Sequence, residues 1–224
     1  MTRFAILLIA LALPAAAQDA ATERPYRTWL AETLWPQAKI QGVSRSTFQL
    51  ALVEARVNWD LPDLVPPGTE AAPPRRNFQA EFRSPARYFR YAASDASVGR
   101  SLAHRHATTL ARLEAETGVP GHVMLAIWGR ESAFGRAPLP HDAFDVLGTK
   151  AFMSRRAEFF QDELLAALQI AEEGHAPGNF LRSSWAGALG QPQFMPTSFL
   201  RHARAGDGDG RSDIWGSVPD TLAS

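Results

Sequence analysis

One glutamate stands where acid–base chemistry is feasible. Glu131 follows Met124, Ile127 and Trp128 by seven, four and three residues, and in a helix this spacing places it on the same stripe as those apolar side chains. We therefore expect the carboxyl group to be pushed toward the core. Burial, and a place near the negative end of the helix dipole, both disfavour the charged form of a carboxyl group. A carboxyl group that stays protonated near neutral pH can act as a general acid.

The helix itself has signals at both ends. Pro120 suits the first helical position and Gly135 suits the residue just past the end. A structural role for the glutamate remains open, because Glu131 could pair with Arg130 or Arg136 or point to solvent. Spacing alone does not separate these alternatives.

A second block, residues 183–199, mixes small residues, amides and apolar side chains. Small residues let a ligand approach the backbone, and glutamine amides both donate and accept hydrogen bonds. This combination of residue types is suited to binding a sugar or peptide polymer. The alternative is a tight hairpin in which Gln191 and Gln193 bond to the backbone. Pro196 is expected to open the next helix.

A third block, residues 205–213, resembles a calcium loop. With Gly210 at the sixth position, Ala205 takes the first, where a carboxylate belongs, and Gly216 takes the twelfth, where a glutamate belongs. The ligands left in this frame are Asp207, Asp209, the carbonyl of Arg211, and Asp213. The alternative is a plain Asp/Gly turn.

The composition limits where the protein works and what it binds. Lys+Arg and Asp+Glu both number 23 in 224 residues, so no basic excess argues for nucleic acid. Residues 1–17 combine Arg3, an apolar run and small residues before Gln18, which predicts a secretory signal peptide and a periplasmic protein. No later segment is apolar enough to span a membrane. The chain has no Cys, which removes the acceptor for a lipid anchor and excludes disulfides.

The remaining pattern predicts a mainly α fold. We expect helices over 26–40, with Pro36 kinking or ending the run, and after Ser44 as N-cap. One long amphipathic helix should pass through Val98 and His106 and stop at Gly118, and another should cover 156–173 before Gly174. The Pro-rich segment 61–77 and residues 139–153 are expected to be non-helical. His104 and His106 are interpreted as surface or packed residues, because two positions apart on a helix they face different ways.

Taken in order, the three blocks resemble those of the lytic murein transglycosylase B family, from about Tyr26 to the last residue. The motifs that carry the resemblance are Gly118-Val119-Pro120, Ile127-Trp128-Gly129, Glu131-Ser132, Phe134-Gly135-Arg136, Ser184-Trp185-Ala186-Gly187-Ala188, Gly190-Gln191-Pro192-Gln193-Phe194-Met195-Pro196, Asp207-Gly208-Asp209-Gly210-Arg211 and Asp213-Ile214-Trp215.

The resemblance implies a lysozyme-like helical core that carries extra N-terminal helices. It implies cleavage of the MurNAc-β-1,4-GlcNAc bond of peptidoglycan, with Glu131 as the single acid/base and a 1,6-anhydro sugar as product. It implies that the enzyme needs no cofactor and that a structural Ca²⁺ can bind at Asp207, Asp209, Arg211 and Asp213. The substrate-binding candidates are Ser132, Ser184, Gln191, Gln193 and Phe194.

The resemblance also implies a domain layout. Residues 18–224 form the catalytic domain, with N-terminal helices and the Pro-rich connection over 26–77 and the catalytic core over 78–224, which stops at Ser224 where relatives continue. Two other functions stay open: a muramidase that uses water, and a truncated peptidoglycan-binding protein without turnover. Ordinary glycosidases use two carboxylates, and the sequence does not exclude a second one among Asp142, Asp145, Glu158 and Asp162.

Overall fold

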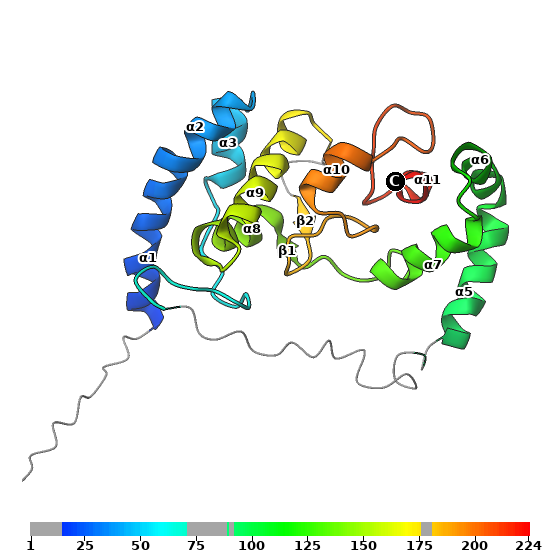
Figure 1. The fold of residues 1–224 in the computed structure, drawn as a ribbon, viewed down its shortest axis with the longest axis horizontal. Helices are drawn as coiled ribbons and strands as arrows, with labels where there is room; N and C mark the ends of the chain where they lie inside the picture. Colours follow the sequence, from blue (N-terminus) through cyan, green and yellow to red (C-terminus); the bar gives the residue numbers. More distant parts are fainter. Residues whose placement is uncertain (1–14, 71–88, 90–91, 176–180) are drawn as a thin grey trace, which may run out of the picture.

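The structure is a computed structural model that describes residues 15–70, 89, 92–175 and 181–224 (Figure 1). Within these ranges the chain is mainly helical, and its two short strands, β1 (His141–Asp142) and β2 (Arg182–Ser183), pair antiparallel. The expected mainly α fold with a small β segment is confirmed. The signal peptide prediction rests largely on residues 1–14, which lie outside the described residues.

The N-terminal helical run does not end at Pro36. It passes from α1 (Ala15–Trp29) through one π-helical turn, η1 (Leu30–Leu34), into α2 (Trp35–Ile40). Pro36 lies in the first turn of α2, and the carbonyl that its missing N–H would have bonded belongs to the π turn, where the bonding pattern has already changed. An end of the run at Pro36 is therefore wrong, and a kink there stays a prediction.

Helix α3 (Arg45–Leu52) begins as its sequence predicts. The side chain of Ser44 accepts a hydrogen bond from Thr47 N at 3.2 Å, which is an N-cap. The same hydroxyl also donates to Glu172 at 2.8 Å and so ties the cap to a second helix. Residues 53–70 contain no helix, in agreement with the Pro-rich expectation, and residues 71–77 lie outside the described ranges.

The centre of the molecule is a pair of packed helices, α8 (Ala143–Met153) and α9 (Ala157–Glu172) (Figure 1). The prediction of loop structure over 139–153 is wrong. Nine of the eleven residues of α8 are buried, so the segment is apolar on nearly every side and shows no one-sided periodicity. Helix α9 is confirmed, and Gly174 follows it with a left-handed φ of 71°.

The single long helix expected before Gly118 is two helices, α5 (Ala92–Arg105) and α6 (Ala107–Thr117). They are separated at His106, whose φ of −107° and ψ of 21° are not helical. The predicted end is confirmed, because Gly118 takes the left-handed conformation with φ of 73°. Beyond it, α7 (Gly121–Ser132) packs against α5. His104 is exposed and His106 is partly buried, as expected.

The buried apolar side chains form two clusters. The first joins the N-terminal helices, α8, α9 and the segment that leads into α10 (Pro196–His202), and it includes Leu189 and Ile214. The second joins α5, α6, α7 and α11 (Val218–Ala223) around Leu125, Trp128 and Leu222. Figure 1 shows the corresponding separation, with α5, α6 and α7 on one side of the α8–α9 pair and α1 to α3 on the other.

Candidate functional site

Glu131 lies in the last turn of α7, and its side chain faces outward. It is exposed, and Ile127, one turn before it, is 55 % exposed, whereas Trp128 is only 4 % exposed. The expectation that Glu131 points into the core is therefore wrong. At roughly 100° per residue, Glu131 lies about 40° from Ile127 and about 60° from Trp128 around the helix, and the buried face is centred on the far side of Trp128, over Leu125 and Ser132.

The turn after Glu131 has an unusual backbone. Three successive residues, Ala133, Phe134 and Gly135, have positive φ angles of 51°, 60° and 77°, a conformation that residues with side chains seldom adopt. The helix therefore ends two residues earlier than Gly135 predicted, and Pro120 is its N-cap residue instead of its first residue. Such backbone outliers cluster at functional sites.

Ser132 supports this turn from inside. It is 3 % exposed, and its hydroxyl donates to Trp128 O at 3.3 Å and accepts from Gly135 N at 3.0 Å. Both bonds hold the backbone around Glu131. A direct contact between Ser132 and substrate stays a prediction.

The second block, residues 183–199 and called here the Gly/Gln block, folds as a tight hairpin that runs into α10. Leu189 and Phe194 exchange backbone hydrogen bonds of 2.7 and 3.0 Å, and the hydroxyl of Ser184 accepts from Ala186 N and Ala188 N at 3.4 and 3.2 Å. Gln193 has a positive φ of 55° and donates to Gly190 O at 2.9 Å. The observed geometry is thus the hairpin alternative. The hydroxyl of Ser184 and the amide of Gln193 each stabilise the turn to which they belong.

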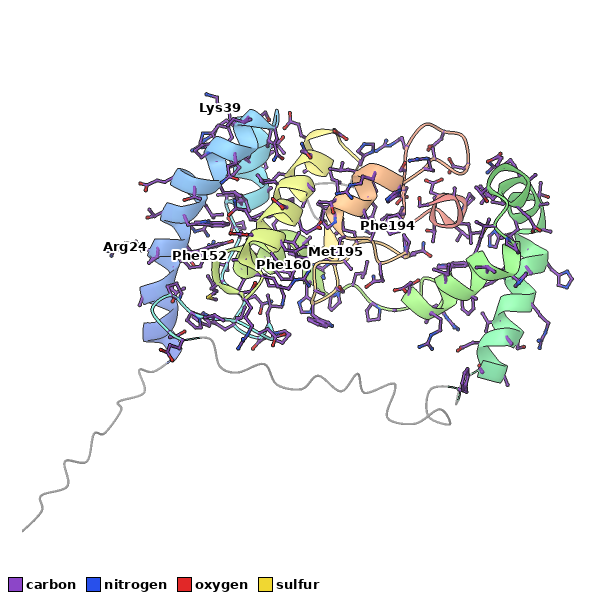
Figure 2. The ribbon with its side chains drawn as sticks, in the orientation of Figure 1. Arg24, Lys39, Phe152, Phe160, Phe194 and Met195 are labelled. Atoms are coloured by element: carbon purple, nitrogen blue, oxygen red, sulfur yellow. The ribbon has the colours of Figure 1, made fainter. Side chains whose placement is uncertain are left out.

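One side chain connects this hairpin to α7. Gln191 accepts a hydrogen bond from Trp128 Nε1 at 2.9 Å and donates to Trp215 O at 3.0 Å. The structure therefore brings the block that contains Ser184, Gln191 and Gln193 against the helix that carries Glu131. Phe194 and its neighbour Met195 are partly buried against the first cluster, where the hairpin passes into α10 (Figure 2).

An exposed aromatic side chain lies in the same hairpin. Trp185 is 54 % exposed, and its ring lies 5.4 Å from the ammonium group of Lys150 in α8. Lys150 itself is 3 % exposed and donates to Pro62 O at 3.2 Å, and burial lowers its pKa below the ordinary value for lysine. The indole of Trp185, next to Ser184 in sequence, is thus about half-exposed and has Lys150 beside it.

The candidate second carboxylates are used elsewhere or exposed. Asp142 accepts from Phe144 N at 2.8 Å as the N-cap of α8, and Asp145 accepts from Arg56 N at 2.9 Å. Desolvation by burial raises the pKa of both carboxyl groups above the ordinary range for aspartate. Glu158 and Asp162 are exposed on α9.

The Asp/Gly loop has the hydrogen bonds of a turn. Asp207 accepts from Asp209 N at 3.1 Å, Asp209 accepts from Arg211 N at 2.7 Å, and Asp213 accepts from Trp215 N at 3.0 Å. Across the described part of the chain, no group of three or more His, Cys, Asp or Glu side chains is placed to hold a metal ion. Together with Ala205 at the first position, this donor set does not fit the Ca²⁺ loop and matches the Asp/Gly turn.

A buried carboxylate to which the sequence assigned no role organises this loop. Asp220 in α11 is 1 % exposed and accepts from the backbone amides of Gly206, Asp207 and Asp213 at 2.8, 3.2 and 2.7 Å. A local signal was available: Ser217 stands three residues before Asp220, and its side chain caps α11 by accepting from Asp220 N at 3.3 Å.

A hollow of about 500 Å³ lies between α5 and α7, on the outer side of the second cluster. Its walls include Gly99 of α5, together with Ala126, Gly129 and Phe134 around the end of α7.

Nowhere in the described ranges is a helix both long and apolar enough to cross a membrane.

Comparisons with known proteins identify a family and several related proteins. A family profile described as "Transglycosylase SLT domain" matches residues 25–224. The membrane-bound lytic murein transglycosylase B of Escherichia coli K12 is 37 % identical over 108 residues, which are 48 % of this chain and 30 % of that protein.

Solved structures agree in fold. SltB3 from Pseudomonas aeruginosa, in complex with NAG-anhNAM-pentapeptide, superposes with a TM-score of 0.72 at 30 % identity, over 88 % of this chain and 50 % of that one. The soluble lytic transglycosylase SltB1 from the same organism has a TM-score of 0.70 at 31 % identity, over 87 % of this chain and 63 % of that one. The chain thus spans about a third of the E. coli relative and half of SltB3.

Proposed function

Because the chain belongs to the transglycosylase SLT domain family, we propose that it is an exported lytic transglycosylase that cleaves peptidoglycan. The observation that carries the proposal is the joining of two elements: the helix that carries Glu131 in its last turn and the Gly/Gln hairpin, linked through Trp128 and Gln191. Further support comes from the ligands of the relative SltB3, which has been solved with NAG-NAM-pentapeptide and with NAG-anhNAM-pentapeptide.

Glu131 acts first as the acid and then as the base. The protonated carboxyl group gives its proton to the glycosidic oxygen as the bond from C1 of MurNAc to that oxygen breaks, and GlcNAc leaves with a free hydroxyl. The carboxylate then takes the proton of the C6 hydroxyl while O6 bonds to C1. This closes the 1,6-anhydro ring and restores the acid, so no water is consumed.

The exposure of Glu131 removes burial as the reason for a protonated carboxyl group, but it leaves the group accessible to a substrate. A general acid must reach the leaving oxygen within hydrogen-bond distance, and the side chain at the end of α7 is open to an incoming polymer. The backbone next to Glu131 is held in place by the hydroxyl of Ser132, which makes two hydrogen bonds in the turn that follows.

The hairpin supplies the binding surface. The exposed ring of Trp185 can pack on the face of a sugar, and Ser184, Gln193 and Phe194 line the same hairpin. Gln191 belongs to the same site through its contact with Trp128. A substrate that provides its own nucleophile needs no second carboxylate, which is consistent with Asp142 and Asp145 accepting hydrogen bonds from backbone amides.

The test is a digest of purified peptidoglycan, with the released muropeptides analysed by mass spectrometry. We expect products that are lighter by one water than those of a muramidase digest, because the anhydro ring replaces a reducing end. Products of hydrolytic mass would identify a muramidase and overturn the proposal.

Glu131→Gln is the matched variant for the chemical step. It keeps the size of the side chain but cannot donate and retake a proton, so we expect at least a hundredfold slower release of products. Pull-down on insoluble peptidoglycan should stay at the wild-type level. Equal, near-zero rates for both proteins with retained pull-down would instead identify a binding protein without turnover.

The predicted signal peptide, residues 1–17, is part of the proposal and places the protein in the periplasm. Expression of the full chain with sequencing of the exported protein should give Gln18 as the first residue. A protein that keeps residues 1–17 would contradict this localisation.

A further inference from the structure

Gln191 makes three hydrogen bonds to segments outside its own turn. Its backbone N–H donates to Ile214 O at 2.9 Å, its side-chain N–H donates to Trp215 O at 3.0 Å, and its side-chain oxygen accepts from Trp128 Nε1 at 2.9 Å. The two ends of the side-chain amide are thus both engaged within the protein. This differs from Gln193, whose amide bonds to Gly190 in the same hairpin.

The bond between Gln191 and Trp128 crosses from one hydrophobic cluster to the other. Trp128 belongs to the second cluster. Leu189, two residues before Gln191, and Ile214, whose carbonyl oxygen accepts from Gln191 N, belong to the first. Glu131 is carried by the second cluster and the hairpin by the first. Their relative position therefore depends on the contacts between the two clusters.

Trp128 connects Gln191 to the end of α7, where Glu131 lies. It stands three residues before Glu131 in α7, it is 4 % exposed, and its ring packs edge-on against Phe134 and His106 with centroids 5.5 and 6.3 Å apart. The backbone oxygen of Trp128 also accepts from Ser132. A shift of the indole would move the turn that holds the glutamate.

Gly135 has no side chain, and this leaves space for the amide of Gln191 beside the end of α7. A Cβ atom built at Gly135 would collide with Oε1 of Gln191, the atom that accepts from Trp128. The positive φ of 77° also favours glycine at this position. The end of α7 is thus shaped around the amide of Gln191.

We propose that Gln191 is a positioning residue that sets the register between the helix end carrying Glu131 and the substrate-binding hairpin. Its catalytic consequence rests on the proposed lytic transglycosylase function, but the link between α7 and the hairpin does not. Gln191 acts through Trp128, and its amide is engaged within the protein before substrate arrives.

The first experiment measures the link without activity. In Gln191→Met, which keeps length and removes both polar ends, the indole N–H of Trp128 should exchange with D₂O at least about fivefold faster in ¹H–¹⁵N spectra, because it loses its acceptor. Trp128→Phe assigns the resonance. Gln191→Glu, which still accepts from the indole, should recover most of the protection.

The matched control is Gln161→Met. Gln161 in α9 also joins two elements through its amide, because its Nε2 donates to Oε1 of Gln37 in α2 at 2.9 Å. It should leave the exchange of the Trp128 indole unchanged. Unchanged exchange in Gln191→Met, or an equal change in Gln161→Met, would overturn the proposal.

The second experiment separates positioning from substrate contact. On a soluble glycan of defined length, Gln191→Met should lower kcat by about tenfold or more with KM within about twofold, because misplacing a catalytic group costs rate more than binding. The double variant with Trp128→Phe should be no slower than the slower single variant. A raised KM with unchanged kcat, or additive losses, would contradict the positioning role. If the wild-type chain shows no turnover, the proposed function fails while the exchange experiment still decides the link.

Discussion

Both carboxylate oxygens of Glu163 in α9 meet Thr197 at the start of α10. One oxygen accepts from Thr197 N and the other from its hydroxyl, each at 2.8 Å, and Glu163 is 3 % exposed. Thr197 follows directly on Met195 and Pro196, where the hairpin ends. This pair therefore fixes the exit of the hairpin on the central helix pair, much as Gln191 fixes its tip on α7.

Glu163→Ala tests how much this pair stabilises the fold. We expect the free energy of unfolding to fall by about 2–3 kcal/mol, because the partly buried backbone N–H and hydroxyl of Thr197 both lose their acceptor. Urea denaturation is the measurement. The neighbouring Asp162→Ala, at an exposed position on the same helix, should stay within about 0.5 kcal/mol of wild type. Similar losses in both variants would show that Glu163 has no special role.

The elements that were predicted correctly carry their signals in adjacent residues. Ser44 caps α3, and Gly118 and Gly174 end their helices with positive φ angles, each through a conformation that one residue type favours. The α8 segment was missed because its apolar residues surround the helix, and one-sided periodicity is what distinguishes a helix from a loop in sequence. Its N-cap, Asp142, was the signal that remained.

The site was predicted in its parts but not in its assembly. The family motifs located Glu131 and the hairpin, but a stripe of apolar residues does not tell which side of the stripe faces the core, so the exposure of Glu131 was predicted wrongly. The contact of Trp128 with Gln191 joins positions 63 residues apart. No local pattern encodes such a contact, because it depends on how the two clusters pack.

Asp142 makes stability depend on pH. Burial raises the pKa of its carboxyl group above the value of 3.8 expected in the unfolded chain, so the folded state holds its proton to higher pH. The stabilising contribution is full below the unfolded value and is lost as pH rises through the folded pKa. Asp142→Asn keeps an acceptor for the amides of Phe144 and Asp145 but cannot ionise.

The variant should therefore gain stability relative to wild type as pH rises from about 4 to about 7, by less than about 1 kcal/mol because the group is only half-buried. The gain includes relief for Asp145, since the Asp142 charge raises the pKa of that carboxyl group too. Urea denaturation at several pH values gives the difference. A constant difference across this range would mean that Asp142 titrates alike in both states.

Added Ca²⁺ should leave the melting temperature unchanged, although the loop at 205–213 resembles a calcium loop. A ligand that binds only the folded state raises its stability with concentration. Here Asp207 and Asp209 already accept hydrogen bonds from the loop backbone, and Ala205 offers no carboxylate at the first position. Thermal unfolding in millimolar CaCl₂ and in EDTA makes the comparison.

The loop should depend instead on Asp220 in α11, whose side-chain oxygens accept hydrogen bonds from three of its backbone amides. Asp220→Asn replaces one accepting oxygen with a donor that faces an amide, so we expect a loss of about 2–3 kcal/mol, the same with and without Ca²⁺. Asp209→Asn, at an exposed position, should have little effect. A melting temperature that rises with Ca²⁺ in wild type but not in Asp209→Asn would contradict this prediction. It would mean that the loop carboxylates bind the ion in preference to the backbone amides.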